Sequence, residues 1–255
     1  MIIDGKAIAQ KILSEIKGNL NGKQVFIAAI SVSSEPAIKS FIEMKKKYAE
    51  SLGMELFEYC FEPGVPESEV LEKIKELSED KKISGMIVEI PLAPGYDQEK
   101  ILNAVPVEKD IDVLAAKAQE NFYKDLSPIY PPAVRALEMV IDEYKVDLKD
   151  KTAAVFGQSI LIGAPISHWL EKRCKKVYRI DTTTSDPESV CKDADIVVSG
   201  VGQPNLIKGE MVKAGAIIID FGFEKLGDKV AGDVDFGSVS PKASLITPVP
   251  GGMGP

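Results

Sequence analysis

Hydrophobic residues follow two patterns that alternate along this chain. Nearly continuous apolar runs, such as 25–32, have the length and composition of β-strands that are covered on both faces. Between these runs, apolar residues recur every three or four positions, as on one face of an α-helix. The two patterns predict helices at 6–20, 37–52, 66–79 and 97–104, and strands at 25–32, 54–61 and 85–90. Strands and helices that alternate in this order indicate a parallel α/β layer.

The alternation stops between 106 and 132, where the sequence becomes polar and rich in proline, as is typical of a hinge. A helix predicted at 133–144 links the two halves. Beyond it the pattern resumes, with helices at 164–173 and 186–192 between four strands at 153–156, 176–181, 196–200 and 216–221. Four strands of this kind predict a nucleotide-binding domain with a Rossmann-like parallel sheet.

The sequence therefore predicts two α/β domains joined by a linking helix. We place the first domain at 1–132, the dinucleotide-binding domain at 133–240, and a segment that returns toward the catalytic cleft at 241–255. The last residues are unusually rich in glycine and proline for a chain end, so we expect further residues after Pro255.

Composition narrows the class of protein. A content of 45% hydrophobic residues can fill substantial cores, and a net charge of -8 argues against nucleic acid or an anionic membrane as a partner. Three cysteines without a CxxC motif and a single histidine predict neither a disulfide framework nor a metal site. The start lacks a signal-peptide pattern and no apolar run reaches eighteen residues, so we expect a cytoplasmic protein.

A glycine turn follows the strand predicted at 153–156. Gly157, Gln158 and Ser159 come directly after this strand, and Gly163 opens the next helix. A helix N-terminus at such a turn presents free N–H groups to a ligand, and a dinucleotide pyrophosphate is a natural occupant. The spacing is not GxGxxG, however, so an ordinary strand-to-helix connection remains the alternative.

Several motifs occur in an order that resembles the methylenetetrahydrofolate dehydrogenase/cyclohydrolase family. They are Asp4-Gly5-Lys6, Pro91-Leu92, the stretch EKDID at 108–112, the glycine turn, Gly232-Asp233-Val234, and the closing string TPVPGGMGP at 247–255. The resemblance implies hydride transfer from 5,10-methylenetetrahydrofolate to a nicotinamide dinucleotide, and then hydrolysis of the methenyl product to 10-formyltetrahydrofolate. It also implies a homodimer joined through the nucleotide-binding domains, with the folate bound by the first domain.

The resemblance assigns Lys45 to proton transfer at the one-carbon centre. Phe41 lies four residues earlier on the same helix face and would stack on the folate, where the family has tyrosine. Glu89 stands where the family has glutamine. A carboxylate beside Lys45 favours its ammonium form, which works against proton transfer near neutral pH but not against hydride transfer. We therefore expect an intact dehydrogenase and a weak cyclohydrolase. Without the resemblance, Lys45 reads as a solvated lysine and Phe41 as a core residue.

Asp112 is expected to bind the amino and ring N–H groups of the pterin, a pattern that suits a carboxylate. Asp110 is the competing candidate, which we expect at the surface, and Val113 replaces a glycine of the family motif. The resemblance places further folate contacts at Phe41, Pro91, Pro248, Gly251 and Gly252.

The resemblance assigns the coenzyme to loops that follow the predicted strands. The expected residues are Gly157, Gln158, Ser159, Ile160, Gly163, Asp181, Thr182, Thr183, Val201, Gly202, Phe223 and Thr247. Gln158 and Thr183 stand where the family carries arginines that suit a 2′-phosphate, although their side chains can donate hydrogen bonds to it. Asp181, 24 residues after Gly157, is suited to the ribose hydroxyls of NAD. We expect NADP, with NAD as the alternative.

Three alternatives remain at this point. An amino-acid or hydroxyacid dehydrogenase would need a catalytic histidine or Lys/Asp pair, which His168 alone in the glycine-turn helix supports poorly. A non-catalytic folate- or nucleotide-binding protein would explain the changes at Phe41, Glu89 and Val113. A dehydrogenase for a modified pterin would explain these changes and the altered segment PIYP at 128–131.

Overall fold

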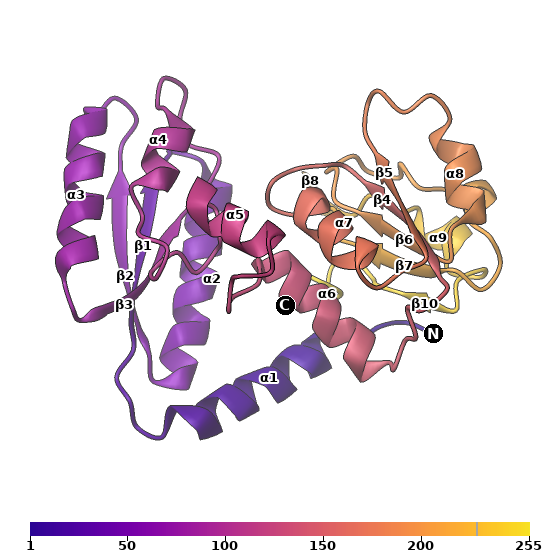
Figure 1. The fold of residues 1–255 in the computed structure, drawn as a ribbon, viewed down its shortest axis with the longest axis horizontal. Coiled ribbons are helices and arrows are strands. Elements are labelled where there is room, and N and C mark those ends of the chain that lie inside the picture. The colour runs from indigo at the N-terminus through magenta and orange to yellow at the C-terminus, as the bar shows by residue number, and fades with distance from the viewer. Residues whose placement is uncertain (228) are drawn as a thin grey trace. The chain divides into compact units, whose positions relative to one another are not determined.

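The chain forms two compact units, which are described separately below (Figure 1). The computed structural model describes residues 1–227 and 229–255. One unit is Leu13–Pro131, and the other combines Met1–Ile12 with Pro132–Pro255. We call them the first unit and the second unit.

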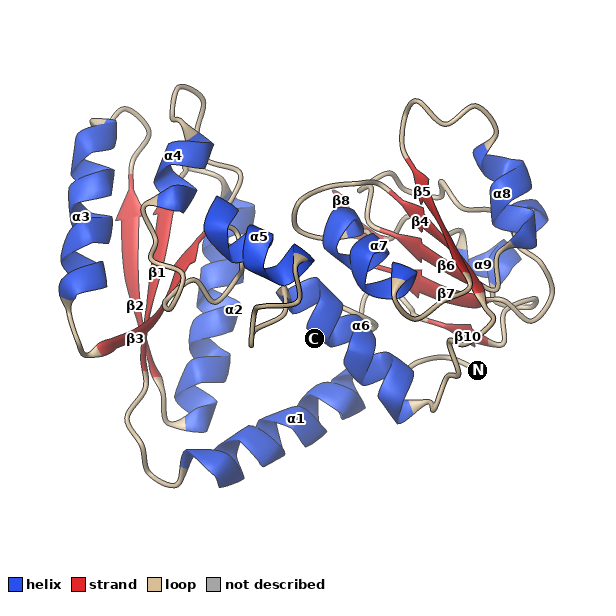
Figure 2. Ribbon diagram, in the orientation of Figure 1, coloured by secondary structure: helices blue, strands red, loops and turns tan. Residues whose placement is uncertain are grey.

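A parallel sheet with the strand order β2-β1-β3 forms the centre of the first unit. Its strands are β1 Phe26–Val32, β2 Glu55–Phe61 and β3 Ile83–Val88. The helices are α2 Pro36–Leu52, α3 Glu67–Glu79, α4 Gln98–Asn103 and α5 Ala116–Tyr123, and helix α1 Gly5–Leu20 enters the unit at Leu13. Apolar side chains of α2 pack on one face of the sheet, and those of α3 and α4 pack on the other (Figure 2). Both faces are therefore covered, which explains the continuous apolar run in β1.

The second unit contains a five-stranded parallel sheet with the order β10-β7-β6-β4-β5. Its strands are β4 Thr152–Phe156, β5 Lys176–Ile180, β6 Ile196–Ser199, β7 Ile217–Asp220 and β10 Leu245–Ile246. The helices are α6 Pro132–Glu143, α7 Gly163–Glu171, α8 Pro187–Asp193 and α9 Phe236–Val239, with a 3₁₀ turn at Gly209–Met211. A small antiparallel hairpin joins β8 Glu224–Leu226 to β9 Lys229–Ala231. The Rossmann-like parallel sheet predicted from the sequence is confirmed.

The structure differs from the sequence prediction at three places. Helix α5 lies inside the stretch that we expected to be irregular. Strand β10 lies in the expected return segment and pairs with β7. The first twelve residues belong to the second unit, where the N–H of Ile3 donates to the carbonyl of Ile246 at 2.8 Å. The chain start thus extends the sheet of the second unit at β10, which is why it separates from the rest of the predicted first domain.

No helix in the part of the chain that the structure describes is both long and apolar enough to cross a lipid bilayer.

Candidate functional site

Helix α2 presents Phe41 and Lys45 on its outer face. Pro36 begins the helix, where its missing N–H leaves no donor unsatisfied. Ile38, Ile42 and Ala49 form the face that is buried against the sheet. Phe41 and Lys45 fall between these positions, so they remain 40% and 34% exposed, respectively. The helix therefore holds an aromatic ring and a cation side by side at a partly open surface.

Glu89 meets Lys45 directly. The backbone N–H of Glu89 donates to the carbonyl of Ile30 at 2.8 Å, which continues the pairing of β3 with β1 by one residue. Its side chain is buried, and Lys45 Nζ lies 2.5 Å from Glu89 Oε1. The contact expected from the sequence is present, and it pairs the lysine with a largely desolvated carboxylate.

Asp112 lies in a turn that several backbone contacts fix. The N–H of Met86 in β3 donates to the carbonyl of Lys109 at 2.7 Å, and Lys109 Nζ donates to the last carbonyls of α3. The Asp110 carboxylate accepts from the N–H groups of Leu114 and Ala115 at 2.9 and 2.7 Å. Asp110 is therefore buried, and the prediction that it lies at the surface was wrong, because its carboxylate closes the turn.

The Asp112 carboxylate lies close to the Lys45–Glu89 pair. The residue keeps some exposed area, but its carboxylate is closely surrounded by protein atoms. Burial raises its pKa to about 6, the charges of Glu89 and Asp110 act in the same direction, and Lys45 opposes them. The structure thus brings Lys45, Glu89 and Asp112 together. Pro91, two residues after Glu89, is exposed.

Val113 occupies the position where the resemblance predicted a glycine. Its φ is +58° and its side chain is buried. A β-branched residue is strained in this left-handed region, by roughly 1–2 kcal/mol. The turn that carries Asp112 therefore keeps the conformation of a glycine turn although no glycine is present.

The glycine turn in the second unit is closed by backbone contacts. Gly157 has a φ of +81°, and a Cβ at Gly163 would lie 1.7 Å from the carbonyl oxygen of Gly157. The N–H of Gly157 donates to the carbonyl of Ile180 at 2.9 Å, and that of Ala164 donates to the carbonyl of Ser159 at 3.1 Å. The start of α7 therefore lies directly against the end of β4, and Ser159 is exposed beside it. The close approach of these two backbone segments therefore requires glycine at 163, and a helix N-terminus at such a turn can hold the diphosphate of a dinucleotide.

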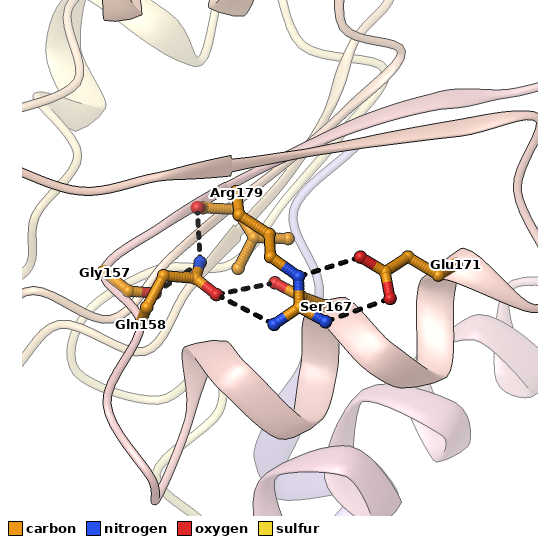
Figure 3. Close-up of polar contacts among 6 residues, drawn as sticks. Gly157, Gln158, Ser167, Glu171 and Arg179 are labelled. Carbon is orange, nitrogen blue, oxygen red and sulfur yellow. Dashed lines mark hydrogen bonds and ion pairs between the residues drawn. The ribbon is translucent and has the colours of Figure 1, made fainter. Parts of the chain in front are cut away.

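The Gln158 side chain turns back into the protein (Figure 3). Its Nε2 donates to the carbonyls of Val155 and Gly157 at 3.1 and 3.0 Å, and its Oε1 accepts from Ser167 Oγ at 3.3 Å. Arg179 Nη1 lies 3.5 Å from the same oxygen, while its Nε and Nη2 donate to both oxygens of Glu171. The Gln158 side chain thus stabilises the glycine turn through these hydrogen bonds. The sequence analysis missed Arg179 and Glu171, whose pairing depends on how β5 packs against α7.

Asp181 follows the end of β5. Its Oδ1 accepts from the N–H and the hydroxyl of Thr183, at 2.9 and 2.6 Å. These hydrogen bonds, with that of the Thr183 hydroxyl the largest, lower the pKa of Asp181, which is therefore ionised at neutral pH. Thr182 and Thr183 are exposed on the same turn.

The remaining predicted coenzyme residues follow the other strands of this sheet. Val201 and Gly202 come after β6, Phe223 comes after β7, and Thr247 comes after β10. Because these strands are parallel, their carboxyl ends meet at one edge of the sheet, together with Gly157 after β4. Ligands of open α/β sheets bind at this edge. Val201 and Phe223 are exposed there, and Ile160 is exposed within the glycine turn.

The closing glycine string packs on the start of α1. The N–H of Gly5 donates to the carbonyl of Gly251 at 3.1 Å, and a Cβ at Gly5 would lie 1.7 Å from the carbonyl oxygen of Gly252. Pro248, Gly251 and Gly252 thus belong to the second unit, whereas Lys45, Glu89 and Asp112 belong to the first. Among the described residues, we find no group of His, Cys, Asp and Glu side chains that could hold a metal ion.

Two family models cover most of the chain. The model "Tetrahydrofolate dehydrogenase/cyclohydrolase, catalytic domain" matches 3–112, and the corresponding NAD(P)-binding domain matches 131–255. The chain belongs to the tetrahydrofolate dehydrogenase/cyclohydrolase family. The resemblance stated from the sequence is confirmed, and the second unit contains the NAD(P)-binding domain of this family.

Relatives match this family member along its whole length. The bifunctional protein FolD of Nautilia profundicola is 36% identical, with 100% of this chain and 92% of the relative covered, and that of Campylobacter hominis is 34% identical with the same coverage. The solved FolD structure from Campylobacter jejuni is 30% identical with a TM-score of 0.95, covering 100% of this chain and 93% of that one. The Trypanosoma brucei enzyme, solved with NADP and an inhibitor, has 27% identity and a TM-score of 0.95, covering 100% and 92%.

Substitution of Gly163 by alanine is expected to disrupt the NAD(P)-binding domain at the glycine turn. The added methyl group would overlap the carbonyl of Gly157, so we expect a loss of about 1–3 kcal/mol in the free energy of unfolding. Affinity for the reduced coenzyme should fall at least roughly tenfold, because the free N–H groups of α7 are displaced. Thermal unfolding and the fluorescence of Trp169, the only tryptophan, measure the two effects.

Gly237→Ala is the matched control in the same unit. A Cβ at Gly237 would lie 3.6 Å from the nearest atom, which is ordinary van der Waals contact. Equal coenzyme affinity in the Gly163→Ala and Gly237→Ala proteins would contradict the role given to this turn.

Proposed function

We propose that this chain oxidises 5,10-methylenetetrahydrofolate to 5,10-methenyltetrahydrofolate and hydrolyses the methenyl product to 10-formyltetrahydrofolate. The observation that carries the proposal is the group formed by Lys45, Glu89 and Asp112 within the unit that matches the catalytic domain. When bound, a nicotinamide dinucleotide accepts the hydride that leaves the methylene carbon. The folate is left with one positive charge shared between its two nitrogens. Water then adds to the methenyl carbon, one proton is released, and one carbon–nitrogen bond breaks to leave the formyl group.

The charges of the group favour the oxidation step. Glu89 and Asp112 are two carboxylates, and Lys45 supplies one positive charge, so the ionised group is net negative. A fixed negative charge stabilises the cation that forms as the hydride departs. We propose that Asp112 also accepts the pterin N–H groups, that Phe41 packs against the folate, and that Pro91, Pro248, Gly251 and Gly252 complete its binding.

The same charges oppose the hydrolysis step. Proton transfer by Lys45 requires that its Nζ be free to contact the reacting nitrogen, and the 2.5 Å ion pair with Glu89 occupies it. Hydride transfer needs no base, only correct positioning. We therefore propose that oxidation is retained and that hydrolysis is slow by comparison.

We propose NADP as the coenzyme, with weak discrimination against NAD. The Trypanosoma brucei relative solved with NADP supports the first part. Weak discrimination is supported by three residues: Gln158 and Thr183 carry no charge, and the ionised Asp181 lies where it would repel a 2′-phosphate or accept a ribose hydroxyl. We propose that the remaining residues expected from the resemblance also contact the coenzyme, namely Gly157, Ser159, Ile160, Gly163, Thr182, Val201, Gly202, Phe223 and Thr247.

The domain roles, the assembly and the location follow from the same resemblance. We propose that the first unit binds the folate, that 133–240 within the second unit binds the coenzyme, and that 241–255 contributes substrate contacts. We also propose a cytoplasmic homodimer, which light scattering of the purified protein would test. The rival non-catalytic binding protein would bind both ligands without reducing the coenzyme, and an absorbance assay separates the two.

Replacement of Glu89 by glutamine is expected to accelerate hydrolysis. The neutral amide no longer forms an ion pair with Lys45, which frees its Nζ for proton transfer, so the ratio of hydrolysis to oxidation should rise at least roughly tenfold. Absorbance of the methenyl intermediate and of the reduced coenzyme, followed together, gives both rates. Glu58→Gln is the matched control, because it removes the carboxylate that pairs with Lys46 at 2.6 Å. Lys46 follows Lys45 directly on α2. An unchanged ratio of hydrolysis to oxidation in the Glu89→Gln protein would contradict the proposal of slow hydrolysis.

The KM for the folate substrate is expected to rise as the pH falls through about 6. Ionised Asp112 accepts the pterin N–H groups, and its pKa of about 6 means that this acceptor is lost by protonation below that pH and is present above it. Burial is the main cause of this raised pKa, Lys45 lowers it, and Glu89 and Asp110 raise it further. The pH profile of KM for the folate in the Asp112→Asn protein should be flat between about pH 5 and 7.5, and a profile that keeps its slope there would assign the effect to another group.

Asp181→Asn is expected to lower the KM for NADP relative to that for NAD by about tenfold, since it removes one negative charge where a 2′-phosphate is expected. The amide oxygen still accepts from Thr183, so the turn is kept. Asp186→Asn is the control, because it removes the same charge five residues away and asparagine caps α8 as well as aspartate does. An unchanged ratio of the two KM values would show that Asp181 does not contact the coenzyme.

A further inference from the structure

Two carboxylates are buried beneath the coenzyme loops of the second unit. Asp220, the last residue of β7, is 2% exposed, and Asp233, which follows β9, is 1% exposed. Neither forms an ion pair within residues 1–227 and 229–255, and the hydrogen bonds described there come from N–H and O–H donors. Buried carboxylates without a cation are unfavourable unless such donors surround them. Their presence calls for an explanation, and the proposed reaction uses neither of them.

Asp233 holds the loop that follows β6. Its Oδ2 accepts from Ser199 Oγ and from the N–H of Val201, both at 2.7 Å. Its Oδ1 accepts from the N–H of Gln203, also at 2.7 Å. A single side chain thereby fixes the two N–H groups on either side of Gly202, and the 44% exposed side chain of Val201 projects from the loop so fixed.

Asp220 performs the same function for the loop that follows β7. Its Oδ1 accepts from the N–H groups of Gly222 and Asp233 at 2.7 and 3.1 Å, and its Oδ2 accepts from that of Val234 at 2.9 Å. Its own N–H donates to Thr247 Oγ1 at 2.7 Å, which connects the residue after β10. Three loops at neighbouring strand ends are thus joined through two side chains.

The surrounding sequence makes room for these carboxylates. A Cβ at Gly222 would lie 2.4 Å from the Asp233 carboxylate, and a Cβ at Gly232 would lie 2.1 Å from Asp220 Oδ2. The motif Gly232-Asp233-Val234 therefore combines the glycine that admits one carboxylate with the other carboxylate itself. Burial, helped by the charge of Asp233, raises the pKa of Asp220 to about 6, so it remains mainly ionised at neutral pH.

We propose that Asp233, with Asp220, is a positioning residue for the coenzyme: it sets the loops 200–203 and 221–223 in the conformation that binds the nicotinamide dinucleotide. The inference rests on the proposed function, because these loops were assigned to the coenzyme. This role explains why carboxylates, each with two acceptor oxygens, occupy positions 220 and 233. A neutral amide of the same shape would direct an NH₂ group at a backbone N–H or at the donors on the other side.

The test is the isosteric variant Asp233→Asn, with Asp235→Asn as its matched control. Asp235 lies two residues on and accepts from Ser238 Oγ at 2.7 Å, so the control makes the same chemical change outside the coenzyme loops. Binding of the reduced coenzyme, followed by energy transfer from Trp169, should weaken at least tenfold in Asp233→Asn and less than twofold in Asp235→Asn. The KM for the folate should stay within twofold in both, a split that general loss of folding would not produce.

Hydrogen exchange of the backbone provides the second measurement. In the wild-type protein without coenzyme, the N–H groups of Val201 and Gln203 should exchange slowly, and in Asp233→Asn these two should exchange at least tenfold faster while β4 and β6 keep their protection. Should Asp233→Asn fail to fold, Ser199→Ala, which removes one donor to the same oxygen, should still speed exchange at Val201.

Coenzyme affinity that is equal in the wild-type and Asp233→Asn proteins, with unchanged exchange at Val201 and Gln203, would overturn the inference while leaving the proposed function intact. Failure of the wild-type protein to bind the reduced coenzyme would instead overturn the coenzyme part of the proposed function, and this inference with it. Equal protection at Val201 in the wild-type and Ser199→Ala proteins would also count against it.

Discussion

The carbonyl of Gly157 and the α-carbon of Gly163 approach so closely that no side chain fits between them. This contact places the start of α7 at the end of β4, and the arrangement of the second unit follows from it. The helix can then cover the sheet with Ile166 and Leu170, both fully buried, while its first N–H groups face the edge where the other parallel strands end. Gln158 strengthens the turn from within by donating to the two carbonyls beside it. A cationic side chain at 158 could donate to these carbonyls but has no oxygen to accept from Ser167 Oγ, so the loss of charge and the additional contact have one cause.

The two units satisfy their buried carboxylates in different ways. In the second unit, backbone N–H groups supply most of the donors to Asp220 and Asp233, and such donors are retained in every substitution except one to proline. In the first unit, Asp110 follows this pattern, but Glu89 depends on the side chain of Lys45. Backbone donors fix a geometry permanently, which suits a frame. A side-chain partner can change its protonation or move, which suits a reacting group.

The sequence predicted every strand of the two parallel sheets except β10, because apolar runs of strand length alternate with segments of helical periodicity. It did not predict α5, whose eight residues bury only Ala118 and Phe122 within a polar stretch, or β10, whose two residues become a strand only by pairing with β7. At the site, the motifs place Lys45 on a helix and Glu89 at a strand end, so the consequence of a contact between them could be stated from the sequence, and the structure shows that contact. The burial of Asp110 and the contact of Ser199 with Asp233, 34 residues apart, depend on tertiary packing, which no local pattern reports.

Glu89 stands where the resemblance implies a glutamine, and this difference sets the stability of the first unit against the chemistry that we propose for it. A glutamate at this largely buried position would carry an uncompensated charge, which is strongly unfavourable, unless a cation came within contact distance. Lys45, one of three consecutive lysines on α2, supplies that cation from the adjacent helix. The side chain that compensates the charge of Glu89 in the fold is therefore the one that we propose for proton transfer in hydrolysis. We propose that oxidation makes no such demand, because the negative charge beside Lys45 stabilises the folate cation. In this proposal, one substitution separates the oxidation step from the hydrolysis step.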